Sequence, residues 1–329
     1  MPLTSRTFLQ SCLQHMLRWT FTLVVLAAVG YATFIAIRFH HLDTRLYAWF
    51  SHLGQQAPVT PAGHDGLTLQ GYALERAIQV AGVGRNLSGL AFDPDRQQLI
   101  AVVNRPATLL RLSQDGSVQS RHALQHAADV EGVAYLGAGR IALVEEGRSR
   151  ILFAQLPETA DAPMDLRHAT ALRLSLQTPE KPGLTTGNQG FEGLAYDARH
   201  DYLYVAKEHS PRALYRISGM ARQSPSGTQS IAVENLSDWV ASDAVVGTDL
   251  SSAEVDPRTG HLLLLSDESQ SLVELDEQGR FLGRIALSDW LAQEGAVPQA
   301  EGIAIDPQGG IYLVSEPNLF YRLRPPPPR

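Results

Sequence analysis

Short stretches of alternating hydrophobic and polar residues recur along most of the chain. Each unit contains a small or acidic residue, usually Gly, and an alternating apolar stretch that leads into a turn. The five units are NLSGLAFDP from Asn86, DVEGVAYLG from Asp129, GFEGLAYDA from Gly190, DLSSAEVDP from Asp249 and QAEGIAIDP from Gln299. A second apolar run follows in every unit, and a third comes after it. A fourth is visible in several units, such as FLGRIAL from Phe281. This alternation is typical of β-strands.

Units of about four short antiparallel strands, repeated every ~40–60 residues, are the signature of a β-propeller. The pattern therefore predicts an all-β, five-bladed β-propeller domain over residues 67–324. The last unit ends after three strands, at Leu323, whereas GYALERAIQV (71–80) belongs to no unit. We expect this N-terminal segment to supply the missing strand and close the ring, which removes exposed strand edges. A six-bladed alternative stays open, with the extra blade in the weakly patterned stretch 156–184.

The N-terminal region has a different pattern. The nineteen residues from Trp19 to Ile37 carry no charge and are bracketed by Arg18 and Arg38. As a helix they would span about 28 Å, close to the thickness of a hydrocarbon core. We interpret them as a single-pass transmembrane helix rather than a signal peptide, whose apolar region is shorter. The predicted parts are a cytoplasmic N-terminal segment (1–17), a transmembrane anchor (18–38), a juxtamembrane linker (39–66), the propeller (67–324) and a Pro-rich tail (325–329).

Charge and cysteine content narrow the functional classes. The net charge is −7, residues 1–50 carry +3, and the rest therefore carries −10, which argues against nucleic acid as a partner. The single cysteine, Cys12, excludes an intrachain disulfide and a cysteine-based zinc site. Basic residues before the apolar segment weakly favour a cytoplasmic N-terminus. That orientation predicts a protein of the bacterial inner membrane with a periplasmic propeller.

Acidic and polar residues recur at two positions of the repeat. In a propeller the first strand of each blade lines the channel and the second returns antiparallel to it. The start of the first strand and the end of the second thus lie at the same channel mouth. The first position holds Ser88, Glu131, Glu192, Ser251 and Glu301, and the second holds Asn104, Glu146, Glu208, Glu268 and Glu316. Seven of the ten are glutamates and none is basic.

Such a set of like charges needs compensation, because carboxylates that converge on a narrow axis raise one another's pKa. A bound cation is the simplest solution, and carboxylate, hydroxyl and amide oxygens suit a hard ion such as Ca²⁺. Protonation of some glutamates, or the nearby Arg105, Lys207 and Arg212, are alternatives. The sequence contains no nucleophile elbow, H-E-x-x-H motif, P-loop or Rossmann glycine pattern.

The segments NLSGLAFD, GFEGLAYD, DLSSAEVD, QAEGIAID and GIYLVSEPNLFYRL resemble the SdiA-regulated (YjiK-like) family of bacterial proteins. The resemblance covers 71–323 and implies a five-bladed propeller, related to NHL-repeat proteins, with a calcium site in a central pocket. The resemblance points most firmly to Glu192, Glu301 and Glu316 as residues of this calcium site, and the segment DVEGVAY adds Glu131. The activity of the family is not established.

Two functions compete at this stage. One is a non-catalytic module that binds a small molecule or an envelope protein at a calcium-stabilised channel mouth. The other is a metal-dependent hydrolase of lactones, esters or phosphoesters, in which the ion polarises an oxygen and activates water. The sequence offers the acids that could hold a metal, but no general base that stands apart from them. A purely structural propeller is a third possibility.

Overall fold

The computed structural model describes residues 4–40, 67, 69–174, 190–208, 212–220, 231–242, 246–291 and 297–326. The chain forms two compact units, Met1–Phe50 and Ser51–Arg329. The predicted linker lies almost entirely outside the described residues, as do most of the tail and part of the stretch 156–184.

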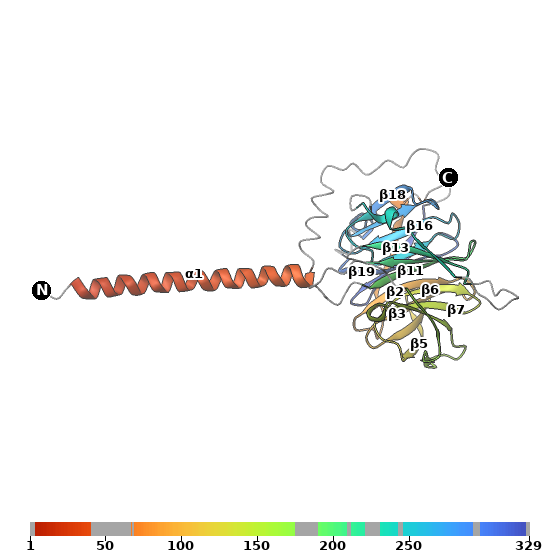
Figure 1. Cartoon of the computed structure of the whole chain (residues 1–329), viewed down its shortest axis with the longest axis horizontal. Helices are drawn as coiled ribbons and strands as arrows, with labels where there is room; N and C mark the ends of the chain where they lie inside the picture. Colours follow the sequence, from red (N-terminus) through yellow and green to blue (C-terminus); the bar gives the residue numbers. More distant parts are fainter. Residues whose placement is uncertain are drawn as a thin grey trace. The chain divides into compact units, whose positions relative to one another are not determined.

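The first unit contains one long helix, α1 (Thr4–His40), which includes the whole predicted apolar segment (Figure 1). The helix begins well before the predicted anchor, so the predicted N-terminal segment and the anchor form one element. Among the described residues, no helix combines the length and the apolar character needed to cross a membrane.

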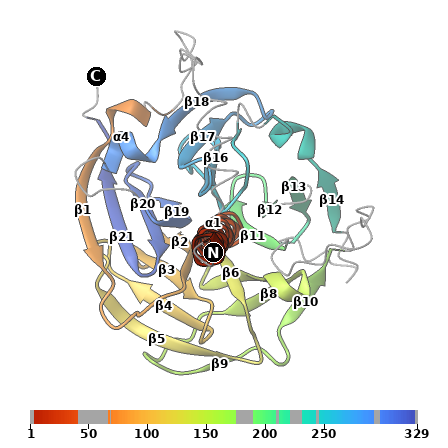
Figure 2. The ribbon, with the colours of Figure 1, turned by 90° about the vertical axis from the view of Figure 1, so that its left-hand side faces the viewer.

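The second unit is a ring of five antiparallel β-sheets, as predicted (Figure 2). Blade 1 contains β2 (Leu87–Asp93), β3 (Gln98–Val103), β4 (Thr108–Leu112) and β5 (Val118–Gln125). Blade 2 contains β6 (Val130–Gly137), β7 (Arg140–Glu145), β8 (Arg150–Gln155) and β10 (Thr170–Arg173). Blade 3 contains β11 (Phe191–Asp197), β12 (Tyr202–Lys207), β13 (Ala213–Ser218) and β14 (Ala232–Asn235).

Blade 4 contains β15 (Ser252–Val255), β16 (Leu262–Ser266), β17 (Ser271–Leu275) and β18 (Phe281–Ala286). Blade 5 contains β19 (Gln299–Ile305), β20 (Ile311–Glu316), β21 (Leu319–Arg324) and β1 (Ala73–Gln79). The short elements are η1 (Leu69–Gly71), η2 (Glu146–Arg148), η3 (Ser237–Val240) and α4 (Leu287–Leu291).

The ring closes as the sequence predicts. Strand β1 pairs antiparallel with β21, from Ala73 opposite Arg324 to Gln79 opposite Leu319. The N-terminal strand therefore completes the C-terminal blade, and the first and last parts of the propeller share one sheet. This arrangement covers the backbone groups of β21 that an open ring would expose.

The stretch 156–184 adds no blade among its described residues. It supplies β10 as the outer strand of blade 2, and β9 (Met164–Asp165) as a parallel addition to β5 of blade 1. The weak pattern of this stretch has a physical reason, since β10 is largely exposed and needs no apolar alternation. The five-bladed prediction is confirmed, and the six-bladed alternative is not supported.

The hydrophobic core lies between the blades rather than along the axis. Five clusters of buried side chains each combine residues of two neighbouring blades. The cluster between blades 5 and 1, for example, contains Tyr312, Phe320, Leu90 and Leu110. Each blade is thus apolar on both faces, which explains the nearly continuous apolar runs of the middle strands.

The glycine that follows the acidic position of the repeat allows the inner strands to approach closely. A Cβ atom on Gly132 would lie 2.3 Å from the carbonyl oxygen of Glu192, and one on Gly89 would lie 2.5 Å from that of Glu131. Both oxygens belong to the inner strand of the next blade. The glycine of the sequence motif therefore serves the packing of a narrow ring, and the acid before it is brought toward the axis.

Candidate functional site

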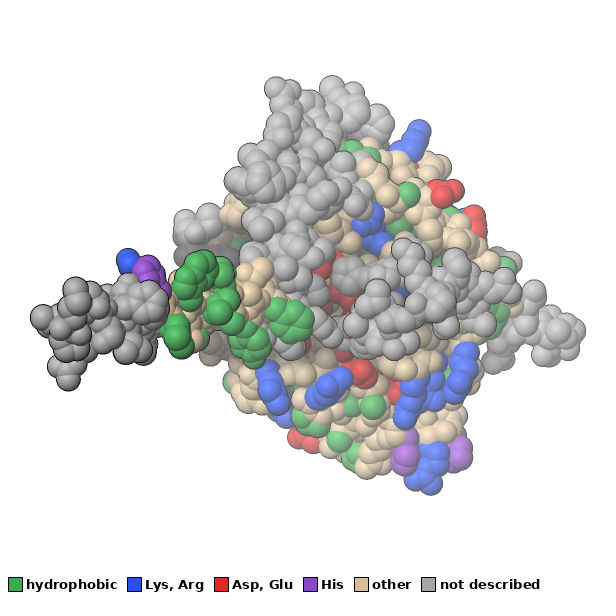
Figure 3. Space-filling view, turned by 60° about the vertical axis from the view of Figure 1, so that its left-hand side comes forward, with side chains coloured by type: hydrophobic (Ala, Val, Ile, Leu, Met, Phe, Trp, Pro, Cys, Tyr) green, Lys and Arg blue, Asp and Glu red, His purple; other side chains and the backbone are tan. Residues whose placement is uncertain are grey.

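Strand register brings the two predicted sets of polar residues to the same end of the blades. In blade 5, Gln299 at the start of β19 faces Glu316 at the end of β20. In blade 2, Val130 at the start of β6 faces Glu145, next to Glu146. We call this end the acidic mouth, defined by the ten predicted positions. Acidic side chains are visible near the middle of the propeller face in Figure 3.

A local irregularity of the inner strands positions three of the glutamates. The ladder skips Glu131 between Val130 and Gly132, Glu192 between Phe191 and Gly193, and Glu301 between Ala300 and Gly302. Each glutamate is therefore the additional residue of a β-bulge. Bulges redirect a side chain and are common beside functional sites.

Glu131 is held by side chains from the neighbouring blade. Its carboxylate accepts hydrogen bonds from Ser88 Oγ at 2.9 Å and from Asn104 Nδ2 at 2.7 Å. Burial raises the pKa of Glu131 to about 7, although these two hydrogen bonds lower it. Glu131 is thus poised between its charged and neutral forms near neutral pH.

Glu192 is the acid that the other acids surround most completely. It is buried, and its pKa is raised well above the usual value, first by desolvation and then by the charges of Glu208, Glu131, Glu146 and Glu301. These charges come from blades 2, 3 and 5. Glu192 therefore marks the point at which the carboxylates converge.

Glu146 and Glu301 extend the same cluster. Glu146 is buried in η2 and accepts a hydrogen bond from the backbone N–H of Gly190 at 3.1 Å, and desolvation raises its pKa. Desolvation also raises the pKa of Glu301 well above the usual value, followed by the charge of Asp267. The pKa of Glu316 is raised by burial, while the charge of Arg85 lowers it.

Blade 4 contributes its acids in a different way. Ser251 and Glu268 are buried at the predicted positions, and Asp249 is completely buried next to them. Asp249 accepts hydrogen bonds from Ser266 Oγ, from the N–H of Asp267 at 2.9 Å and from the N–H of Glu268 at 3.2 Å. Its pKa is raised by desolvation and by the charge of Glu268.

Three acids of the mouth were absent from the predicted set: Asp129, Asp249 and Asp267. The charge of Asp129 raises the pKa of Glu131, and the charge of Asp267 raises the pKa of Glu301. The pKa of Asp249 is itself raised, after desolvation, by the charges of Glu268 and Asp267. A signal for two of them was present, because the repeat unit begins with Asn86, Asp129 and Asp249 at equivalent positions. Asp267 directly precedes a predicted residue but belongs to the turn after β16, whose path the pattern does not define.

Three basic residues near the acidic mouth differ in how they contact it. Arg105 binds Asp129 at 2.7 Å and is largely exposed. Arg212 donates to the backbone oxygens of Val240 and Gly247. Lys207 is buried, and desolvation lowers its pKa. For Glu192, the causes of the raised pKa are desolvation and four carboxylate charges, so protonation or a bound cation would compensate it.

The donor chemistry of the mouth fits calcium. Carboxylate, hydroxyl and amide oxygens are the ligands that a hard divalent ion prefers, and they come from all five blades. Within the described parts of the chain, however, no three histidine, cysteine or acidic side chains already form a metal-binding group. The residues thus supply suitable ligands and charge, but not a preformed coordination shell.

A five-bladed β-propeller with an acidic channel mouth is the class of protein that this fold and geometry define. The family model for SdiA-regulated proteins matches residues 64–324. The chain belongs to the SdiA-regulated family, as the sequence motifs predicted.

Solved structures similar to this chain share little sequence with it. A luciferin-regenerating enzyme is 14% identical over 75% of this chain and 94% of its own, with a TM-score of 0.48. A chain of a nidogen/laminin complex is 14% identical over 70% and 73%, with a TM-score of 0.44. A gluconolactonase from Xanthomonas campestris is 16% identical over 83% and 99%, with a TM-score of 0.43. At these values none of the three informs the chemistry of this chain.

Proposed function

We propose that this protein is a membrane-attached, extracytoplasmic binding module whose acidic mouth takes up a calcium ion and presents a surface for a small-molecule or envelope-protein ligand. The observation that carries the proposal is the position of Glu192. It is buried among Glu131, Glu146, Glu208 and Glu301, whose charges all raise its pKa. A divalent cation would remove this repulsion and allow the acids to ionise together.

The residues that would hold the ion are those at the centre of this cluster. Glu131, Glu192 and Glu301 lie on bulges of three inner strands, and Glu146 and Glu316 approach from the ends of second strands. Bound calcium would supply positive charge and link blades at the acidic mouth, in addition to the apolar clusters and hydrogen bonds that already join them. Ser88 and Asn104 would keep Glu131 oriented through the hydrogen bonds that they already donate.

Membrane attachment is a separate part of the proposal. Its support is the uncharged segment between Arg18 and Arg38 and the exposure of large apolar side chains along α1, among them Trp19, Phe21 and Leu26. Exposed apolar surface of this extent is typical of a segment that contacts a membrane or a partner. The test is extraction of membranes from expressing cells with alkaline carbonate. Full-length protein should stay in the pellet and the chain from Ser51 in the supernatant, whereas a soluble full-length protein would contradict attachment.

The calcium proposal is tested by thermal unfolding of the full chain with Ca²⁺ and with a chelator. Ligands that bind only the folded state raise the melting temperature. We expect Ca²⁺ to raise it in the wild type and in Glu158→Gln, which removes one exposed acid. We expect no increase in Glu192→Gln. Equal shifts in all three proteins would contradict binding at the acidic mouth.

The same proteins separate the binding module from a metal-dependent hydrolase. Incubation with a panel of lactones, esters and phosphoesters should give no turnover for a binding module. Calcium-dependent turnover that Glu192→Gln abolishes and Glu158→Gln retains would identify the hydrolase instead.

A further inference from the structure

A cavity lies at the end of the inner strands opposite the acidic mouth. It has a volume of about 170 Å³ and is lined by residues near the ends of the inner strands and in the turns that follow them. Because each inner strand starts at the acidic mouth and rises about 3.3 Å per residue, lining residues two to four positions further along lie about 7–13 Å from that mouth. It is therefore separate from the proposed calcium site.

The wall of this cavity is apolar except at one position. Aromatic rings of Phe92, Tyr135 and Tyr196 and the small side chains of Ala134 and Ala195 line it. The hydroxyls of both tyrosines are engaged with acids, Tyr135 with Asp95 and Tyr196 with Asp201. Among the described residues that line the cavity, Glu254 alone carries a charge.

Glu254 departs from the repeat. The equivalent residue in the other four blades is an alanine, at positions 91, 134, 195 and 304. An alanine suits the narrow centre of the ring, so the glutamate in blade 4 is not required by the fold. A carboxyl group has instead been placed in an otherwise apolar space.

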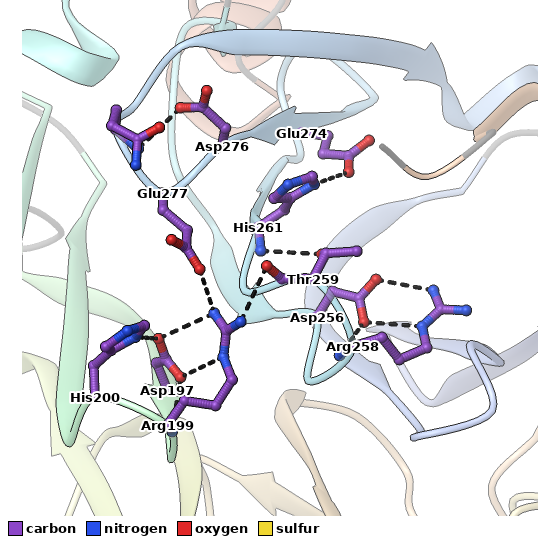
Figure 4. A network of polar contacts seen from close by, with 11 residues as sticks. Asp197, Arg199, His200, Asp256, Arg258, Thr259, His261, Glu274, Asp276 and Glu277 are labelled. Atoms are coloured by element: carbon purple, nitrogen blue, oxygen red, sulfur yellow. Dashed lines mark hydrogen bonds and ion pairs between the residues drawn. The ribbon is translucent and has the colours of Figure 1, made fainter. Parts of the chain in front are cut away.

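Other acids at this end of the propeller have strong partners. Figure 4 shows Asp197 bound by Arg199 and His200, and Asp256 bound by Arg258. The Arg258 Nη2 to Asp256 Oδ2 distance is 2.9 Å. Arg199 also reaches Glu277 at 2.7 Å, which ties the turn after β11 to blade 4. These acids are neutralised by a network that fixes the turns around the cavity.

Glu254 takes no part in this network. Within the described part of the chain, its one hydrogen bond comes from the backbone N–H of Val255, at 2.9 Å. Desolvation raises the pKa of Glu254 to about 8, and the charge that acts on it, that of Asp256, raises the pKa further. No positively charged group of the described residues pairs with this carboxyl.

We propose that the cavity binds a small organic ammonium ion, with Glu254 as the anionic partner and the aromatic wall around the hydrocarbon part. An ammonium group would supply the missing charge and hydrogen-bond donors, and aromatic faces attract such cations. A metal ion fits poorly, because a calcium ion takes six to eight oxygen ligands and the lining provides a single carboxylate. The volume is close to that of cavities that hold a benzene-sized molecule, at roughly 150 Å³.

The test uses calorimetric titration of the full chain with benzylammonium and with benzyl alcohol, its neutral analogue, at about pH 8. We expect benzylammonium to bind at least about tenfold more tightly than benzyl alcohol, which corresponds to about 1.4 kcal/mol. Glu254→Ala, which introduces the residue of the other four blades, should remove this preference. Glu254→Gln preserves the size of the side chain and should also remove the preference for benzylammonium. Glu158→Gln should retain that preference.

Three results would overturn the proposal. Equal binding of benzylammonium by the wild type and Glu254→Ala would place the ligand elsewhere. Tighter binding of benzyl alcohol than of benzylammonium would identify Glu254 as a neutral hydrogen-bond donor. Loss of benzylammonium binding in Glu192→Gln, with retention in Glu254→Ala, would show that the amine binds at the acidic mouth. None of these outcomes depends on whether the mouth binds calcium.

Discussion

Asn104 of blade 1 donates a hydrogen bond to the carboxylate of Glu131 on blade 2, with 2.7 Å between Nδ2 and Oε1. The bond connects two blades at the acidic mouth and stabilises the charged form of Glu131. It partly offsets the desolvation that raises the pKa of this group to about 7.

Substitution Asn104→Ala should therefore raise the pKa of Glu131 above about 7. The reason is that the carboxylate loses a donor that favours its ionised form. Side-chain carbon chemical shifts of labelled glutamate, followed as a function of pH, would measure the change. Asn235→Ala, on the exposed strand β14, serves as the control. An unchanged pKa in Asn104→Ala would show that the bond does not form in solution.

Gly132→Ala should destabilise the propeller strongly. The new methyl group would lie 2.3 Å from the backbone oxygen of Glu192, which cannot move without displacing β11. Overpacking of this kind costs about 1–3 kcal/mol or more. Gly84→Ala is the matched control, because no atom lies within 4 Å of its added Cβ. Urea unfolding of both variants measures the effect, and equal stabilities would contradict the close approach of the inner strands.

Removal of the closing strand should open the ring. A chain that begins at Ser51 retains β1, whereas a chain that begins at Ala81 exposes the edge of β21 and uncovers the side chains that contact Ile78. We expect the shorter chain to lose its cooperative thermal transition and to aggregate. Circular dichroism and size-exclusion chromatography would compare the two. Identical melting temperatures would mean that β1 does not close the propeller.

Stability without calcium should fall as the pH rises from about 4.5 to 8. Glu131 has its pKa raised from 4.5 to about 7 in the folded protein, and the pKa values of Glu192 and Glu301 are raised as well. Between the unfolded and folded values, the folded state holds more protons, so the free energy of unfolding decreases with pH. The stabilisation is complete below about pH 4.5 and is lost as the pH passes the folded pKa values.

A pKa shift of the size found for Glu131 corresponds to a loss of about 3 kcal/mol in the free energy of unfolding. Urea unfolding at several pH values in the presence of a chelator measures it. Glu192→Gln should flatten the dependence, because the amide does not titrate. A rise in stability over the same pH interval would contradict the desolvated, protonated state of these acids.

The sequence predicts the blades well because strands buried between neighbouring sheets must be apolar throughout. Leu99 to Val103 and Leu262 to Leu265 are examples. The closing role of β1 follows from a simple count, since the last unit lacks its outer strand. The positions of Glu131, Glu192 and Glu301 at one mouth follow from the antiparallel order of the strands.

Other features depend on interactions that no single repeat displays. The bulges at these glutamates are shifts of strand register, which the alternation of apolar and polar residues does not display. Asp267 lies at the acidic mouth because of the path of the turn after β16. There its carboxylate accepts a hydrogen bond from the backbone N–H of Ala300 on blade 5 at 2.9 Å. That Glu254 takes no part in the ion-pair network can be recognised only from the structure, in which Asp197 and Asp256 pair with Arg199 and Arg258.

The most direct test of the central claim is a calorimetric titration of the full chain with Ca²⁺ in two buffers of different ionisation enthalpy, at about pH 7. Metal binding to protonated carboxyls releases protons, so the observed heat should depend on the buffer. We predict one calcium ion per chain, with proton release that is reduced in Glu192→Gln and retained in Glu158→Gln. Absence of calcium binding would contradict a calcium site at the acidic mouth. Calcium binding that releases no protons and is unchanged in Glu192→Gln would contradict it as well.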